Sequence, residues 1–190
     1  MKIQNKNLPI RSSFLSCEKD AETIIKKLFV ASGKNSEELK RLLVINAKDC
    51  LDSSNQSYDE IIKKVSVKTL MEENYITLVP RVQLKEHEKV KSYIIISFDN
   101  FTPSSNPEFR DCSVHFDILC YTDTWNLGDY QTRPIKIMGY IDGILNNSRL
   151  SGIGTLQFSG ASELIIDETL SGYTLSFSAT HGNDDRIEGE

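Results

Sequence analysis

The 190-residue sequence predicts an α+β fold, in which a mainly antiparallel β-sheet packs against helices. Three observations lead to this prediction. Apolar residues in the first third recur at helical spacing, apolar and polar residues alternate from Tyr75 onward, and one helical segment separates two groups of strands. We therefore expect an N-terminal helical region over residues 1–74, an α+β domain over residues 75–182, and an acidic flexible tail over residues 183–190.

The N-terminal region is predicted to contain three helices. Ser16 caps the first, which ends before Gly33, and Ser36 starts the second, which runs to Cys50. Ser57 begins the third in a capping-box pattern with Glu60. The first two helices each carry one apolar stripe that we expect to face the core: Ala21, Ile24, Ile25, Leu28 and Phe29 in the first, and Leu39, Leu42, Leu43 and Ala47 in the second.

The α+β domain is predicted to begin with a hairpin, in which polar residues 85–89 join a strand from Tyr75 to a partner strand over residues 90–101. Residues 112–121 alternate most clearly and form the next strand. A helix then runs from Thr132 to about Asn147, and because it carries more than one apolar stripe we expect it to be buried on two sides or used at an interface. Two further strands are predicted over residues 154–162 and 172–181.

The charge is unevenly distributed along the chain. Residues 1–91 contain 17 Lys and Arg against 13 Asp and Glu, a net charge of +4, whereas the remainder contains 5 against 14, a net charge of -9. An acidic half disfavours lasting contact with phosphate backbones, so sequence-specific binding of nucleic acid is not expected. No apolar run approaches the ~18 residues of a membrane span. Since an export signal is also lacking, we expect the protein to be made and used in the cytoplasm.

The residues that could carry chemistry are not grouped as a reaction site requires. The four cysteines have neither CxxC spacing nor a histidine partner at ligand spacing, so no metal is expected. Ser113, His115 and Asp117 share one strand face but spread over roughly 13 Å, too far to form a nucleophile triad. We therefore expect no catalytic residue, no cofactor and no enzyme activity. A small cytoplasmic α+β enzyme with a site near His115 remains the alternative from a different class, and a DNA-binding module a third.

Residues 93–181 show a characteristic order of predicted elements and short motifs. Two strands are followed by Arg133-Pro134 at a helix start, then by a glycine turn, an acidic pair and a final strand; the motifs are Gly152-Ile153-Gly154, Phe158-Ser159-Gly160-Ala161, Asp167-Glu168 and Gly172-Tyr173. This order resembles the tail terminator, or tail completion, proteins of tailed bacteriophages. The helical region and the predicted hairpin before Tyr93 lie outside the resemblance.

The resemblance implies a virion structural protein that forms a ring, typically a homohexamer, at the head-proximal end of the phage tail. Such a ring ends assembly of the tail tube and joins the tail to the head. Its implied partners are copies of itself, the tail tube protein and a neck or head-completion protein, with DNA passing through the ring. The implied location is the tail or neck of the virion, after assembly in the cytoplasm of the host bacterium. Another phage neck or connector ring protein is the alternative.

The contact surface of such a ring is expected in exposed loops that carry aromatic residues. The loop from Asp123 to Arg133 and the end of the strand at Phe101 combine these properties. We therefore predict an oligomer or partner interface at Phe101, Trp125, Tyr130 and Arg133.

Overall fold

The computed structural model describes residues 9–30, 33–78, 90–105 and 109–182, except for the side chains of residues 9–16 and 181–182. The helices are α1 (Pro9–Phe29), α2 (Lys34–Val44), α3 (Gln56–Lys64), α4 (Val67–Glu72), the 3-10 helix η2 (Thr122–Thr124) and α5 (Arg133–Leu145). The strands are β1 (Ile76–Thr77), β2 (Ser92–Pro103), β3 (Phe109–Tyr121), β4 (Asn126–Gly128), β5 (Gln131–Thr132), β6 (Arg149–Leu150), β7 (Gly154–Thr155), β8 (Gln157–Ile165) and β9 (Leu170–Gly182).

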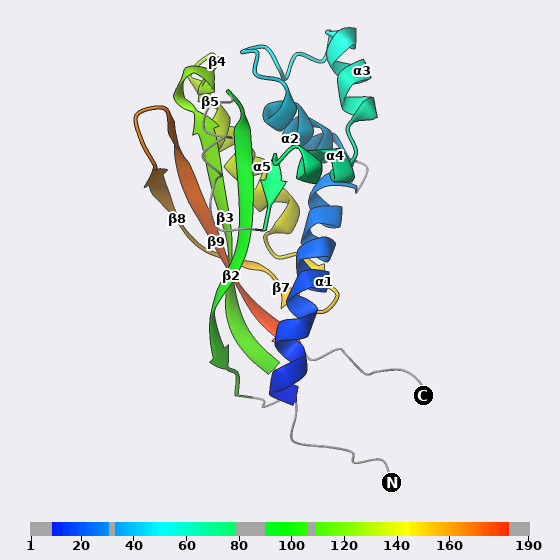
Figure 1. Cartoon of the computed structure of the whole chain (residues 1–190), viewed down its shortest axis with the longest axis vertical. Coiled ribbons are helices and arrows are strands. Elements are labelled where there is room, and N and C mark those ends of the chain that lie inside the picture. Colours follow the sequence, from blue (N-terminus) through cyan, green and yellow to red (C-terminus); the bar gives the residue numbers. More distant parts are fainter. Residues whose placement is uncertain (1–8, 31–32, 79–89, 106–108, 183–190) are drawn as a thin grey trace.

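The main sheet has the strand order β1-β2-β3-β9-β8, and Figure 1 shows β8 and β1 at its two sides. All neighbouring strands are antiparallel except β1, which runs parallel to β2 over two residues. β3 and β9 pair without interruption from Phe109–Gly182 to Tyr121–Leu170. The α+β fold class predicted from the sequence is confirmed.

One face of the sheet is covered by helices and forms the main core. Fully buried residues come from both parts of the chain: Ile24 and Leu28 of α1, Leu39 and Leu42 of α2, Val114 and Phe116 of β3, Ile137 and Ile141 of α5, and Phe177 of β9. The Phe116 and Phe177 rings meet edge to face, with their centroids 5.7 Å apart. The helical region and the sheet therefore share one continuous core, and a boundary near residue 75 passes through it.

The opposite face of the sheet is polar along much of its length but carries a second, smaller apolar cluster of Tyr93, Ile95, Leu119 and Leu170, with Leu164 packed against it. The alternation of residues 90–101 predicted only Ile94, Ile96 and Phe98 on the buried face. Ile94 and Ile96 are buried as expected, but Tyr93 and Ile95 are buried as well. β2 is therefore apolar on both faces over this stretch.

Several boundaries differ from the sequence-based expectation. α1 begins at Pro9 and not after Ser16. α2 ends at Val44, because Ile45 adopts an extended conformation, so the segment up to Cys50 is not helical. The cap of α3 is Asn55, whose side chain accepts from the Ser57 N–H, and not Ser57 itself. The predicted antiparallel hairpin is wrong, because β1 runs parallel to β2. The turn predicted at 85–89 and the tail at 183–190 lie outside the described residues.

Candidate functional site

A two-stranded hairpin, β4–β5, lies at the upper end of the molecule in Figure 1. The chain turns through Gly128, Asp129 and Tyr130, whose φ angles are 90°, 45° and 61°. This left-handed backbone is costly for a bulky residue such as tyrosine. The Tyr130 side chain is fully exposed, at 109% of its reference area, so packing within the subunit does little to offset that cost. An exposed ring on a strained turn marks this tip as a candidate contact point for another molecule.

The base of the hairpin is held by hydrogen bonds on both sides of the 3-10 helix η2. The Thr124 hydroxyl donates to the Tyr121 carbonyl at 2.8 Å, and the Arg133 N–H donates to the Trp125 carbonyl at 2.7 Å. Nε of Arg133 also donates to the Thr124 carbonyl at 2.8 Å. These hydrogen bonds hold both ends of the hairpin in place beneath the exposed Tyr130 tip.

The Arg133 side chain is completely buried and crosses from the start of α5 to the end of α2. Nη1 donates to the carbonyls of Leu42 and Ile45 at 2.6 and 2.8 Å, and Nη2 donates to the Ala47 carbonyl at 2.9 Å. A helix leaves its last carbonyls without intrahelical partners, and its dipole favours a cation there. The prediction that Arg133 is an exposed interface residue is wrong, because its guanidinium satisfies these interior carbonyls.

The other three predicted interface residues differ in exposure. Trp125 is half-buried: its indole N–H donates to the Cys120 carbonyl at 3.2 Å, and its ring centroid lies 6.3 Å from that of Tyr173. Phe101 is also half-buried and packs against the main core. Tyr130 alone among the four is fully exposed. An interface role for Phe101, Trp125 and Tyr130 stays a prediction.

The hairpin is joined to the turn between β8 and β9. The Thr122 N–H donates to the Thr169 carbonyl at 2.8 Å, and an Asp167 carboxylate oxygen accepts from the Thr169 and Leu170 N–H groups at 2.7 and 2.9 Å. We call residues 122–132 and 165–169 the hairpin end. Its exposed side chains include the apolar Tyr130, Ile165 and Ile166 and the acidic Asp123, Asp129, Asp167 and Glu168, beside the neutral polar residues Thr122, Asn126, Gln131 and Thr169.

A second polar constellation lies on the outer face of the sheet around His115. Its Nε2 lies 2.7 Å from an Asp99 carboxylate oxygen on β2, and its Nδ1 lies 2.7 Å from the Ser176 hydroxyl on β9. Asp117, which the sequence places on the same strand face as His115, does not bind the imidazole and accepts a hydrogen bond from the Thr174 hydroxyl. Sequence reasoning missed Asp99 and Ser176 because only the pairing of β2, β3 and β9 brings them together.

The Ser176–His115–Asp99 array contains the three groups of a hydrolytic triad. In a triad of this kind the histidine donates from one ring nitrogen to the carboxylate, and its other nitrogen in the neutral ring accepts from the serine hydroxyl. Acyl transfer also needs free N–H donors aimed at the developing oxyanion. β3 is hydrogen-bonded on both sides, to β2 and to β9, and the Asp99 side chain is 55% exposed. The array is best explained as polar pairing across three strands.

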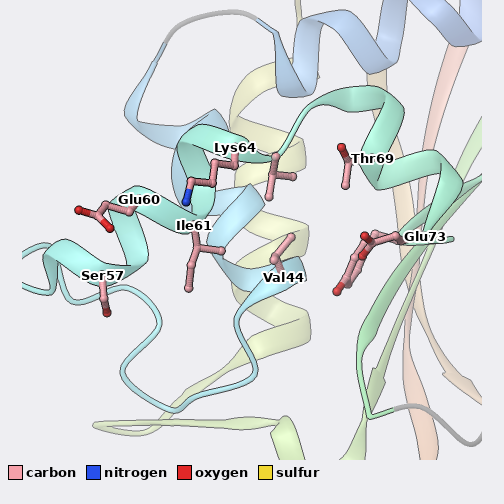
Figure 2. Close-up of a pocket in the computed structure, with 9 residues that line it drawn as sticks. Val44, Ser57, Glu60, Ile61, Lys64, Thr69 and Glu73 are labelled. Atoms are coloured by element: carbon pink, nitrogen blue, oxygen red, sulfur yellow. The ribbon is translucent and has the colours of Figure 1, made fainter.

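A groove lies between the end of α2 and helices α3 and α4, with a volume of about 500 Å³ (Figure 2). Val44 and Ile61 lie at its centre, with Lys64 on the α3 side and Glu73 on the opposite side. Its apolar lining also includes Val65 and Tyr75. The groove offers apolar contact area with charges of both signs at its margin, and we assign no reaction to it.

The cysteines of the described region are free thiols, and three of them are buried. Burial raises the pKa of Cys112 and of Cys120 to about 12, so both are neutral and unreactive at ordinary pH. Within the described residues, no three His, Cys, Asp or Glu side chains gather as metal ligands do. None of the described helices is long and apolar enough to span a membrane.

Comparison with known families gives a match that covers most of the fold. The model of the YomW family matches residues 36–179, which is more than half of the chain. The chain belongs to the YomW family. This family is associated with phages, so the expected phage origin is confirmed at that level. No curated protein matches the chain.

The YomW match includes every feature described above as a candidate site. It extends from α2 to β9 and so contains the groove, the hairpin end, Arg133 and the His115 array. α1 lies outside the match, although Ile24 and Leu28 of this helix are fully buried in the shared core. In this YomW-family protein, the core is therefore completed by a helix that the family match does not reach.

Proposed function

We propose that this YomW-family protein is a virion structural protein that forms a ring at the head-proximal end of the phage tail. The ring ends assembly of the tail tube and joins the tail to a neck or head-completion protein. The association of the family with phages supports this proposal, and so does the resemblance of residues 93–181 to tail terminator proteins.

The observation that carries the proposal is the hairpin tip. Tyr130 combines a left-handed backbone with a fully exposed aromatic ring, and aromatic residues of this kind are enriched at protein interfaces. The carboxylates of Asp123 and Asp129 in the same loop favour a partner surface that carries basic groups. We propose that the β4–β5 tip around Tyr130 contacts another virion subunit and that the protein acts without catalytic chemistry.

The test is the mass of the purified protein in solution, measured with and without purified tail tubes, followed by negative-stain imaging. A ring at any concentration, or one that forms on the tube ends, supports the proposal. A chain that stays free of rings and does not bind tube ends overturns it.

The matched variants are Tyr130→Ala and Phe109→Ala. Both remove an exposed aromatic ring, but Phe109 lies at the opposite end of β3 from the hairpin. We expect Tyr130→Ala to weaken ring formation or tube binding while the thermal unfolding midpoint stays unchanged, and Phe109→Ala to leave both intact. Equal assembly by the two variants contradicts a role for the hairpin tip. Trp125 is unsuitable for this test because its half-buried ring also supports the fold.

A further inference from the structure

We infer that β8 pairs antiparallel with β8 of a second copy of this chain, giving a two-fold dimer with one continuous sheet. β8 is the last strand of the main sheet, and among the described residues it pairs with β9 alone (Figure 1). Along its other side the described part of the chain supplies no strand. At the start of the strand one main-chain group is already bonded within the subunit, because the Phe158 N–H donates to the Asn146 side chain at 3.1 Å. An edge of nine residues is a template for pairing with another chain.

The composition of β8 leaves this edge unguarded. Proteins usually protect an edge strand with lysine, proline, a bulge or a covering segment. β8 contains no Lys, Arg or Pro, and Glu163 is its single charged residue. It has one bulge, between Phe158 and Gly160. Phe158 and Ile165 are 51% and 72% exposed, and Ile166, which follows the strand, is 47% exposed. The edge therefore presents both unpaired main chain and apolar side chains.

These apolar side chains make the strand complementary to itself. Phe158 lies four residues before Ser162, and Ile166 lies four residues after it. Opposed residues of an antiparallel pair run in reverse order, so pairing centred on Ser162 brings Phe158 of each copy to the Ile165–Ile166 end of the other. The bulge between Phe158 and Gly160 shifts the side-chain alternation by one residue, so Phe158 shares its face with Ile165. The same register places Glu163 opposite Ala161, so the two carboxylates do not face each other.

Both apolar ends also lie on the same face of the sheet. Phe158 pairs with Phe177, which points into the main core, and Ile165 pairs with Ser171, the partner of Cys120, which also points into that core. A two-fold axis perpendicular to the sheet keeps the helix-covered faces of the two copies on one side. The Phe158 and Ile165 side chains of the two copies then meet in two equivalent clusters.

This dimer goes beyond the proposed ring and does not depend on it. An isologous contact uses the same patch on both copies and closes on itself. The Tyr130 tip belongs to β4–β5 and not to the sheet edge, so it stays available to other subunits. The two contacts can therefore be removed separately.

The first experiment compares Ile165→Lys with Ile135→Lys by sedimentation equilibrium over a concentration series. Ile135 is a matched control, because it is 50% exposed but lies on α5. A lysine at position 165 places a desolvated charge in the pairing edge, so we expect the dimer dissociation constant to rise by about tenfold or more. The wild type and Ile135→Lys should show species of twice the 21.5 kDa chain mass, or even-numbered assemblies of it.

The second experiment tests the register with Ser162→Cys and the control Ser178→Cys, an exposed position on β9. Under mild oxidation the Ser162→Cys variant alone should form a covalent dimer, because its two copies of residue 162 face each other across the two-fold axis. A wild type that never dimerises, a dimer that survives Ile165→Lys, or equal cross-linking of both variants overturns the inference. A ring that survives Ile165→Lys supports the proposed function and overturns the β8 pairing. A dimer that never forms rings and never binds tails supports the β8 pairing and overturns the proposed function.

Discussion

Replacing Arg133 by methionine is expected to destabilise the fold strongly. Methionine fills much of the same volume but donates no hydrogen bond, so the carbonyls of Leu42, Ile45, Thr124 and Ala47 all lose a charged donor. None of the salt bridges in the described region involves Arg133. The substitution therefore leaves orphaned main-chain acceptors and not an orphaned carboxylate.

The magnitude follows from these acceptors. Each buried carbonyl left without a partner costs about 1–3 kcal/mol. The bonds to Leu42, Ile45 and Thr124 are buried, whereas the one to Ala47 is partly exposed and can exchange for water. Removing the arginine also removes the cost of burying its charge, which offsets part of the loss. We expect Arg133→Met to lower the free energy of unfolding by about 3–5 kcal/mol.

Urea unfolding followed by tryptophan fluorescence measures this loss, because Trp125 is the single tryptophan and its carbonyl accepts from the Arg133 N–H. Arg149→Met is the control: Arg149 is exposed, so its loss should be within about 0.5 kcal/mol of zero. Arg133→Lys, which keeps the charge but not the planar fork of donors, should fall between them. A free energy of unfolding for Arg133→Met within about 1 kcal/mol of the wild-type value would show that the guanidinium hydrogen bonds do not hold α2 to α5.

Two further predictions concern buried groups. The thiols of Cys112 and Cys120 have a pKa raised to about 12 in the folded state, so above pH 9 the unfolded chain loses protons first and stability falls as the pH rises. Each thiol should lower the free energy of unfolding by about 1.4 kcal/mol between pH 8 and 10; urea titrations at both pH values check this, and Cys112→Ala should remove its share of the pH dependence. Gly172→Ala should cost about 3 kcal/mol or more, because a Cβ there would lie 1.8 Å from the Ile118 carbonyl oxygen, whereas Gly160→Ala, with nothing within 4 Å, should change stability by less than about 1 kcal/mol; thermal unfolding of the two variants tests this contrast.

The regular elements with a clear period could be predicted from the sequence. The stripe of Ile24 and Leu28, and the alternation around Phe116, each identify an element and its buried face, because apolar spacing alone decides them. Boundaries were less predictable: α2 ends at Val44 although apolar residues continue at helical spacing to Cys50. There the carbonyls of Ile45 and Ala47 are satisfied by Arg133, so a tertiary contact replaces the helical hydrogen bonds.

The candidate site was predictable only in part, because its decisive contacts join distant segments. The aromatic loop could be identified from composition, but sequence alone could not show that Tyr130 is exposed while Arg133, three residues later, is buried. The Ser176–His115–Asp99 array depends on the register of three strands, which no local pattern specifies. The open edge of β8 likewise depends on strand order, because alternation predicts a strand but not its neighbours.

The span of the Arg133 contacts also has a consequence for synthesis. Leu42 and Arg133 are 91 residues apart in the chain. At roughly 5–20 residues per second, a ribosome adds Arg133 about 5–18 s after Leu42. During that interval the last carbonyls of α2 lack their donor, and the apolar faces of α1 and α2 lack the strands that cover them. The apolar faces of the N-terminal helices therefore stay uncovered, and accessible to chaperones and proteases, until most of the protein has been made.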